Sequence, residues 1–338
     1  MNLTPKQQFL KAFRHESIPC VPGFEIEFQL YREYAGEWPV VGEEMAKLSP
    51  KERELAHGHN AEIMIRAAEA CHHNALKDIG AMWEISPGHP ADLYMPTLED
   101  RLAHLRALRK VAGDDYFIFG TVYLPLSIPF FGDLTAYSME LIDEPEKCEA
   151  RSMSAVHEML QLQEQLLEAG ADGILDDCDL AFNTGTFLSP DMMDQFFFPA
   201  FKVWTEACNK DNIPCVWHSD GNLNGIFDRI LESGVNALHC IDPLADMDIA
   251  ALKRRSKGKL TLIGNIDCSI IHMGTPEQCY EKTTEILTAV RAEEASGHIF
   301  SSCNTIFLGM PKENYDAVIA ARLDFNKKLQ AEADAARQ

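Results

Sequence analysis

Short apolar segments alternate with longer stretches of helical periodicity from residue 114 onward. This alternation is typical of a parallel sheet whose strands are joined by helices. The segments are apolar on both faces, as strands buried between layers are. We expect strands at 117–120, 174–177, 213–218, 235–241, 260–266 and 298–302, and helices at 146–168, 190–210, 222–233, 246–256, 276–294 and 312–334.

The N-terminal part adds a helix starting at Thr4 and Pro5, an alternating strand at 21–28 and a helix-rich stretch at 32–113. An open, doubly wound sheet would show the same alternation, but no strand is followed by a glycine-rich phosphate loop. Polar residues instead gather at the C-terminal ends of many strands, which favours a barrel. We therefore predict an α/β fold, a (β/α)₈ TIM barrel with a helical N-terminal extension, forming a single domain over 1–338.

The formal charge of −22 argues against nucleic-acid binding and against anionic membrane surfaces, because both favour a basic face. The N-terminus lacks the pattern of a signal peptide, and no apolar run approaches the ~20 residues of a membrane span. Ten cysteines in a chain of this length are best interpreted as reduced thiols rather than a disulfide scaffold. We expect a cytoplasmic protein.

Metal-capable side chains end several expected strands. His218 and Asp220 share a face of an extended segment, and both residue types are accepted by zinc. Between Cys240 and Cys268 lie 27 residues, and between Cys268 and Cys303 lie 34, each about one strand–helix unit. Because neighbouring strands lie about 4.8 Å apart, their terminal thiols can converge on one ion. We predict a zinc site drawn from these five residues, with buried core thiols as the alternative for the cysteines.

Carboxylates mark two further strand ends. Glu25 and Glu27 share one face of the first strand, where a charged group is costly unless it is paired or functional. Asp177 belongs to the acidic run 176–179, which can hold a hard cation, act as a base or solvate a loop. Glu25, Glu27 and Asp177 are the expected acid–base residues. We expect His239 to point toward the helices as a structural residue and His73 to lie on the surface.

Several motifs resemble the uroporphyrinogen decarboxylase superfamily, most strongly across 170–320. They are Ile241-Asp242-Pro243, Asp246-Met247-Asp248, Leu252-Lys253, Gly264-Asn265-Ile266-Asp267-Cys268, Gly274-Thr275-Pro276-Glu277 and Pro311-Lys312-Glu313-Asn314-Tyr315. The resemblance implies a (β/α)₈ barrel with its site at the C-terminal rim.

This superfamily contains cofactor-free porphyrinogen decarboxylases and zinc methyltransferases that work with corrinoid proteins. The decarboxylases bind their substrate through an arginine-rich N-terminal segment, where this chain is acidic at Glu25 and Glu27. The thiol-methylating branch holds zinc with His-x-Cys and a distant Cys, which His218 and Cys303 match, although Asp220 replaces the middle cysteine. The branch that demethylates methoxyarenes uses an Asp and two Cys on later strands, and Cys240, Cys268 and Cys303 occupy comparable places.

The resemblance therefore implies a zinc-dependent methyltransferase that moves methyl from a small methylated, methoxyaromatic substrate to a corrinoid carried on a partner protein. Methyl transfer from the corrinoid to a thiol, and a metal-free decarboxylase or lyase acting on a small acid, stay open, as do a non-catalytic binding barrel and a homodimer. Residues expected to contact the substrate are Glu84, Tyr123, Phe130, Phe131, Asn222 and Asn265.

Overall fold

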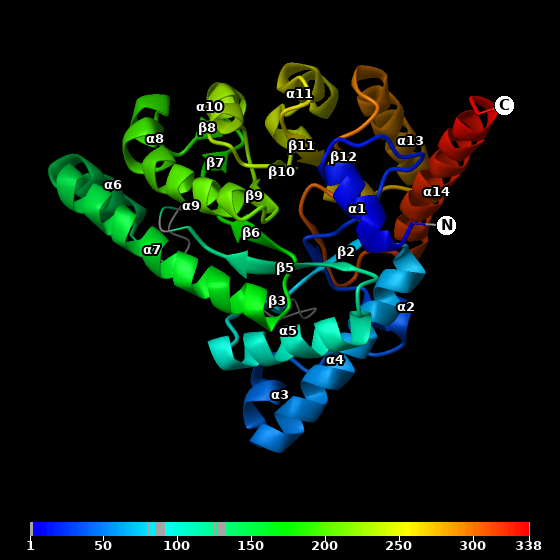
Figure 1. Cartoon of the computed structure of the whole chain (residues 1–338), viewed down its shortest axis with the longest axis horizontal. Coiled ribbons are helices and arrows are strands. Elements are labelled where there is room, and N and C mark those ends of the chain that lie inside the picture. Colours follow the sequence, from blue (N-terminus) through cyan, green and yellow to red (C-terminus); the bar gives the residue numbers. More distant parts are fainter. Residues whose placement is uncertain (1–2, 80–81, 85–91, 125, 127–132, 338) are drawn as a thin grey trace.

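Seven parallel strands form the central sheet of the computed structural model (Figure 1). The structure describes residues 3–79, 82–84, 92–124, 126 and 133–337, with 82–84 and 92–94 described by backbone alone. The strand order is β12–β11–β10–β9–β6–β5–β2. These strands are β2 (Ala75–Lys77), β5 (Phe117–Val122), β6 (Gly173–Asp177), β9 (Cys215–Ser219), β10 (Ala237–Cys240), β11 (Thr261–Ile263) and β12 (His298–Ile299).

The segment around Gly23 closes this sheet into a barrel. Gly23 forms a parallel bridge with Phe300, directly after β12. The carbonyl of Gly23 also accepts the backbone N–H of Asn74, directly before β2, at 2.7 Å. The segment thus lies between the two edge strands, and the predicted (β/α)₈ class is confirmed. The strand expected at 21–28 is this segment together with β1 (Glu27–Phe28), which pairs with β13 (Thr305–Ile306).

Helices pack around the outside of the sheet, as Figure 1 shows. The expected helix-rich stretch at 32–113 also contains β2, which the sequence pattern did not indicate because three residues are too few to show alternation. Among the described residues, no helix combines the length and apolarity needed to cross a membrane. The α-helices that follow α1 (Pro5–Phe13) are α2 (Tyr31–Ala35), α3 (Gly42–Lys47), α4 (Pro50–Cys71), α5 (Leu98–Ala112), α6 (Leu134–Asp143), α7 (Pro145–Ala169), α8 (Pro190–Phe196), α9 (Phe198–Lys210), α10 (Phe227–Glu232), α11 (Ile249–Ser256), α12 (Cys268–Met273), α13 (Pro276–Glu293) and α14 (Lys312–Ala335). Two short antiparallel strand pairs lie outside the central sheet. They are β3 (Met82–Glu84) with β4 (Asp92–Tyr94), and β7 (Ala181–Phe182) with β8 (Gly185–Thr186).

The first helix, α1 (Pro5–Phe13), covers the N-terminal end of the barrel. Thr4 caps it, and the side-chain oxygen of Gln7 in turn accepts the backbone N–H of Thr4. The backbone N–H of Lys6 donates to the carbonyl of Asp115, just before β5. The ring of Phe9 stacks on Phe117 with 4.8 Å between centroids. With this end filled by aromatic rings, the C-terminal end is left for chemistry.

The interior of the barrel changes from apolar to polar along the strands. Residues two positions apart face the same side of a strand. The buried core cluster at the α1 end includes Ala75, Leu175, Val216, Ala237 and Ile299. Two residues further along the same five strands, on the same interior face, come Lys77, Asp177, His218, His239 and Ser301.

Candidate metal centre and active site

His218 lies at the centre of three carboxylates at the C-terminal rim. Its Nε2 atom is 3.6 Å from Oδ1 of Asp179, 3.7 Å from Oδ1 of Asp220 and 3.8 Å from Oδ1 of Asp177. Asp177 and His218 are register partners on β6 and β9, so these strands set their spacing. In the described part of the chain, Asp179, His218 and Asp220 are the one group of three metal-capable residues whose ligand atoms all lie within 4.8 Å of one another.

The electrostatics of this group fit a bound cation. Burial alone would lower the pKa of His218, but the charges of Asp220, Asp177 and Asp179 outweigh it and raise the pKa. Burial raises the pKa of Asp220 to about 6, against the opposing effect of His218. Oδ1 of Asp220 is buried and has no hydrogen-bond partner among the described residues. A divalent cation would satisfy this oxygen and relieve the repulsion between the carboxylates.

The other ring nitrogen of His218 contacts a second histidine. Nδ1 of His218 lies 2.8 Å from Nδ1 of His239, and Nε2 of His239 lies 3.1 Å from the hydroxyl of Ser301. The prediction that His239 points toward the helices was wrong. His239 is the register partner of His218 and therefore faces the barrel interior with it. The backbone turns sharply at Cys240, where φ is 137°. The rule that successive side chains of a strand point to opposite faces therefore does not hold between His239 and Cys240.

Glu25 is buried behind this pair. Its Oε2 atom accepts hydrogen bonds from the hydroxyls of Ser301 (3.2 Å) and Ser302 (2.5 Å) and from the backbone N–H of Ser302 (3.0 Å). Its Oε1 atom accepts the hydroxyl of Tyr315 at 2.9 Å. Burial raises the pKa of Glu25 to about 7, although all of these donors oppose the shift. The prediction that His73 is a surface residue was wrong, because it is buried against the Tyr315 hydroxyl at 2.9 Å.

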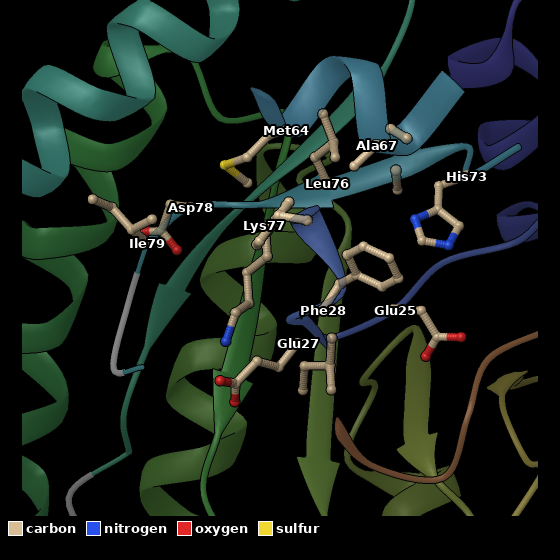
Figure 2. Close-up of a pocket in the computed structure, with 14 residues that line it drawn as sticks. Glu25, Glu27, Phe28, Met64, Ala67, His73, Leu76, Lys77, Asp78 and Ile79 are labelled. Carbon is tan, nitrogen blue, oxygen red and sulfur yellow. The ribbon is translucent and has the colours of Figure 1, made fainter. Parts of the chain in front are cut away.

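Glu27 on β1 and Lys77 at the end of β2 add two further charged residues to the rim. The ammonium group of Lys77 is 3.1 Å from Oδ2 of Asp177. Burial would raise the pKa of Asp177, but the charge of Lys77 outweighs burial and holds it low. Figure 2 shows Lys77 pointing toward Glu27 in a pocket that Glu25, His73 and Asp78 also line. The ammonium group of Lys77 therefore interacts with the charges of both Asp177 and Glu27.

The three cysteines of the predicted zinc site lie together beside the carboxylates. The sulfurs of Cys268 and Cys303 are 3.9 Å apart, and the thiol of Cys240 faces both Cys303 and Asp220. The contacts with Cys240 and Cys268 lower the pKa of Cys303, whereas the contact with Cys303 and burial raise the pKa of Cys268. Asp220 therefore links the three thiols to the other two members of the compact group, Asp179 and His218.

The residues expected to contact substrate are placed unevenly. Asn265 is buried after β11; its amide nitrogen donates to the carbonyl of Ile241, and its Oδ1 has no partner in the described chain. Asn222 accepts the backbone N–H of Asn224, and Tyr123 follows β5 at the rim. Phe130, Phe131 and the side chain of Glu84 lie outside the described residues.

Sequence reasoning missed four participants. Asp179 was part of the acidic run at 176–179, but only the register of β6 against β9 indicates which carboxylates face His218. Lys77 lies on the short strand that the pattern did not indicate. His239 and Ser301 could have been found from the two-residue spacing that relates them to Ala237 and Ile299.

Comparisons with known proteins bear on this arrangement. A family model described as Uroporphyrinogen decarboxylase (URO-D) matches residues 97–325, which include the His218 cluster and all three cysteines. Among solved structures, a methyltransferase from Methanosarcina mazei is 17% identical, with a TM-score of 0.75 over 96% of this chain and 99% of that chain. A putative vitamin-B12 independent methionine synthase from Listeria monocytogenes is 12% identical, with a TM-score of 0.52 over 97% and 99%. A sequence search of curated proteins found no match. At these identities the structural likenesses show a shared fold.

Proposed function

The chain belongs to the uroporphyrinogen decarboxylase family, and from this premise we propose that it is a zinc-dependent methyltransferase. It would move methyl from a small methylated substrate, with a methoxyarene as the first candidate, to a corrinoid carried on a partner protein. The single observation that carries the metal assignment is the unpartnered, buried Oδ1 of Asp220, 3.7 Å from Nε2 of His218. The whole-chain likeness to the Methanosarcina mazei methyltransferase supports the choice of methyl transfer.

The charges at the rim disfavour the decarboxylase alternative. A decarboxylase that acts on a small acid needs a free cation to hold the substrate carboxylate. Lys77 is paired with Asp177, and the guanidinium group of Arg101 is paired with Asp78 at 2.7 Å. The run Lys253-Arg254-Arg255 lies on α11, where Lys253 donates to the carbonyl of Gly297 at the opposite, N-terminal end of β12. A substrate with several carboxylates would meet Glu27, Asp177 and Asp179 at the rim, where Lys77 is already engaged with Asp177.

In this proposal His218, Asp220 and Asp179 hold the metal, with Cys240 and Cys303 beside them as softer donors. When bound, the metal supplies Lewis acidity toward the leaving oxygen. The methyl group leaves as the C–O bond breaks, the electron pair stays on oxygen, and that oxygen needs a proton or an equivalent positive charge. Glu27 and the Lys77–Asp177 pair are the nearby groups that can hold or move that proton.

A second candidate activity is methyl transfer from the corrinoid to a small thiol. The observation that favours it is the cluster of Cys240, Cys268 and Cys303 beside Asp220, in which the pKa of Cys303 is lowered, since sulfur ligands suit a zinc that binds a thiol acceptor. The two activities run in opposite directions with respect to the corrinoid. A methoxyarene with cob(I)alamin tests the first, and methylcobalamin with a small thiol tests the second.

The first experiment is elemental analysis of the purified protein, with Asp220→Asn and Asp179→Asn as site variants. Asp242→Asn is the matched control, because Asp242 follows β10 at the same rim but caps a turn by accepting the backbone N–H of Leu244. We expect about one zinc per chain in the wild type and the control, and much less in the two site variants. Absence of metal from wild-type protein reconstituted with zinc under anaerobic conditions would contradict the proposal.

A further inference from the structure

A continuous chain of buried hydrogen bonds runs from His218 to Glu25. Its links are Nδ1 of His218 to Nδ1 of His239 at 2.8 Å, Nε2 of His239 to Oγ of Ser301 at 3.1 Å, and Oγ of Ser301 to Oε2 of Glu25 at 3.2 Å. All four side chains are buried, with 7% or less of each residue exposed. The chain crosses from the barrel interior, where His218 lies, to the contact between the Gly23 segment and α14, where Glu25 meets Tyr315.

When Glu25 is ionised, as it is at about pH 8, the chemistry of these groups fixes the direction of every link. Oε2 of Glu25 also accepts the backbone N–H of Ser302, so the single proton of Ser301 points toward Glu25. Oγ of Ser301 must then accept from Nε2–H of His239. With one proton on Nε2, His239 presents an unprotonated Nδ1, and the contact at 2.8 Å requires His218 to donate from its own Nδ1.

We propose that Glu25 is a positioning residue that acts through Ser301 and His239 to place the proton of His218 on Nδ1. The Nε2 atom of His218, which faces Asp177, Asp179 and Asp220, is then the nitrogen whose lone pair is available for a metal. This inference rests on the proposed function for its purpose, since a metal-binding histidine needs one defined free nitrogen. The proton placement itself follows from this chain's own hydrogen bonds.

A second buried histidine in the same barrel, His298, shows how this role differs from ordinary burial of a histidine ring. His298 on β12 is also buried, and its Nε2 donates to the backbone carbonyl of Gly264 at 2.8 Å. One backbone acceptor satisfies that ring, and His298 does not contact the rim carboxylates. His239 instead contacts two side chains, one of which is the candidate metal ligand.

Two adjacent serines provide a matched pair of variants. Ser301 and Ser302 both donate a hydroxyl to Oε2 of Glu25, but only the hydroxyl of Ser301 contacts His239, and both variants keep the backbone contact of Ser302 with that ring. Ser301→Ala and Ser302→Ala thus remove the same group from the same carboxylate, and only Ser301→Ala breaks the link to His218. Folding of each variant is checked by the ring pattern of His298, which should not change.

The readout is the protonation pattern of the rings in ¹⁵N-histidine-labelled protein without metal, from two-bond nitrogen–proton correlations. At about pH 8, above the usual titration range of histidine, we expect His239 to carry its proton on Nε2 in the wild type and in Ser302→Ala. In Ser301→Ala we expect His239 to show a mixture of both forms. A wild-type His239 protonated on Nδ1, or identical patterns in the two variants, would overturn the proposal.

Zinc affinity gives a second readout on the same three proteins. We expect Ser301→Ala to bind zinc about tenfold more weakly than the wild type, and Ser302→Ala to bind within about twofold of it. Equal affinity in all three would overturn the positioning role and leave the metal site intact. If the wild type binds no zinc, the proposed function fails, and the ring patterns alone decide the proton placement.

Discussion

His218 and His239 are register partners on adjacent parallel strands, and their Nδ1 atoms lie 2.8 Å apart. Because partners in register face the same side of the sheet, the two rings share the barrel interior at the level where its lining changes from apolar to polar. One ring faces three carboxylates, and the other faces Ser301 and, beyond it, Glu25. The pair therefore connects the candidate metal site to a buried carboxyl group that does not touch it.

Replacement of Asp220 by Asn should have opposite effects on stability and metal binding. Burial raises the pKa of Asp220 to about 6, so its charge at neutral pH is unfavourable in the metal-free protein. Because the side chain is about one-third exposed, we expect Asp220→Asn without metal to be more stable by about 1 kcal/mol, measured by urea unfolding.

Added zinc should reverse this order. Zinc at about 100 times its Kd should stabilise the wild type by about 2.7 kcal/mol and leave Asp220→Asn nearly unchanged, with Asp242→Asn responding like the wild type. Equal zinc-induced shifts in the melting temperature of wild type and Asp220→Asn would show that Asp220 is not a ligand.

The free energy of unfolding should depend on pH through Glu25. Its carboxyl group is raised from 4.5 to a pKa of about 7 by burial, so the folded protein binds this proton more tightly than the unfolded chain does. Its stabilising contribution is complete below about pH 4.5 and is lost as the pH rises through about 7, a change of at most about 3 kcal/mol.

Glu25→Gln removes this titration and keeps the shape of the side chain. The difference in unfolding free energy between wild type and Glu25→Gln should therefore grow more unfavourable to the wild type from about pH 5 to about pH 8. Taking the difference between the two proteins removes the contribution of Asp220, which has the same sign. A difference that does not change with pH would show that Glu25 keeps an ordinary pKa.

The ion pair between Lys77 and Asp177 should be needed for folding stability. Both groups are largely buried, with side-chain exposures of 9% and 22%. Lys77→Met removes the ammonium group from the carboxylate of Asp177, which lies near Asp179 and Asp220, and we expect a loss of about 3–5 kcal/mol in urea unfolding. Lys77→Met combined with Asp177→Asn should recover most of that loss.

The exposed pair of Lys47 and Glu43 on α3 provides the contrast. Its side chains are 71% and 86% exposed, and Lys47→Met should cost less than about 1 kcal/mol. If Lys77→Met is as mild as Lys47→Met, Asp177 must be protonated or hydrated when it loses its partner.

The sequence was sufficient for the barrel and for the strand ends that carry its polar residues. Long apolar and helical periods locate α7, α13 and α14 and strands β6, β9 and β10, because several residues contribute to each pattern. β2 has three residues and was missed, and with it Lys77, the cation that pairs with Asp177. The single domain over 1–338, the zinc and the corrinoid partner stay predictions.

The features of the site that the sequence could not predict depend on contacts between different strands and helices. His218 and Asp220 were found from their positions on one strand, but Asp179 reaches His218 only because β6 and β9 pair in a particular register. Glu25 was expected to be an acid–base residue, but its partners could not be predicted: its oxygens accept from Ser301, Ser302 and Tyr315, the last of which is 290 residues away in sequence. No local pattern encodes such contacts.

The thiols of Cys268 and Cys303 should form a disulfide under mild oxidation. Their sulfurs are 3.9 Å apart, and the contacts with Cys240 and Cys268 lower the pKa of Cys303, so Cys303 is the thiol of the pair that ionises more readily. With glutathione disulfide, Cys303 attacks to form a mixed disulfide, and Cys268 displaces the second glutathione, so that two glutathione thiols are released per bond formed. Peptide mass spectrometry should find the Cys268–Cys303 link with the loss of two hydrogens.

Cys268→Ser should stop at the mixed disulfide, whereas Cys279→Ser, which alters a buried thiol on α13, should react like the wild type. A bond between Cys240 and Cys303 instead would mean that Cys240 is the nearer partner in solution. Unreacted thiols would mean that the buried Cys303 is not ionised or is not reached by glutathione disulfide.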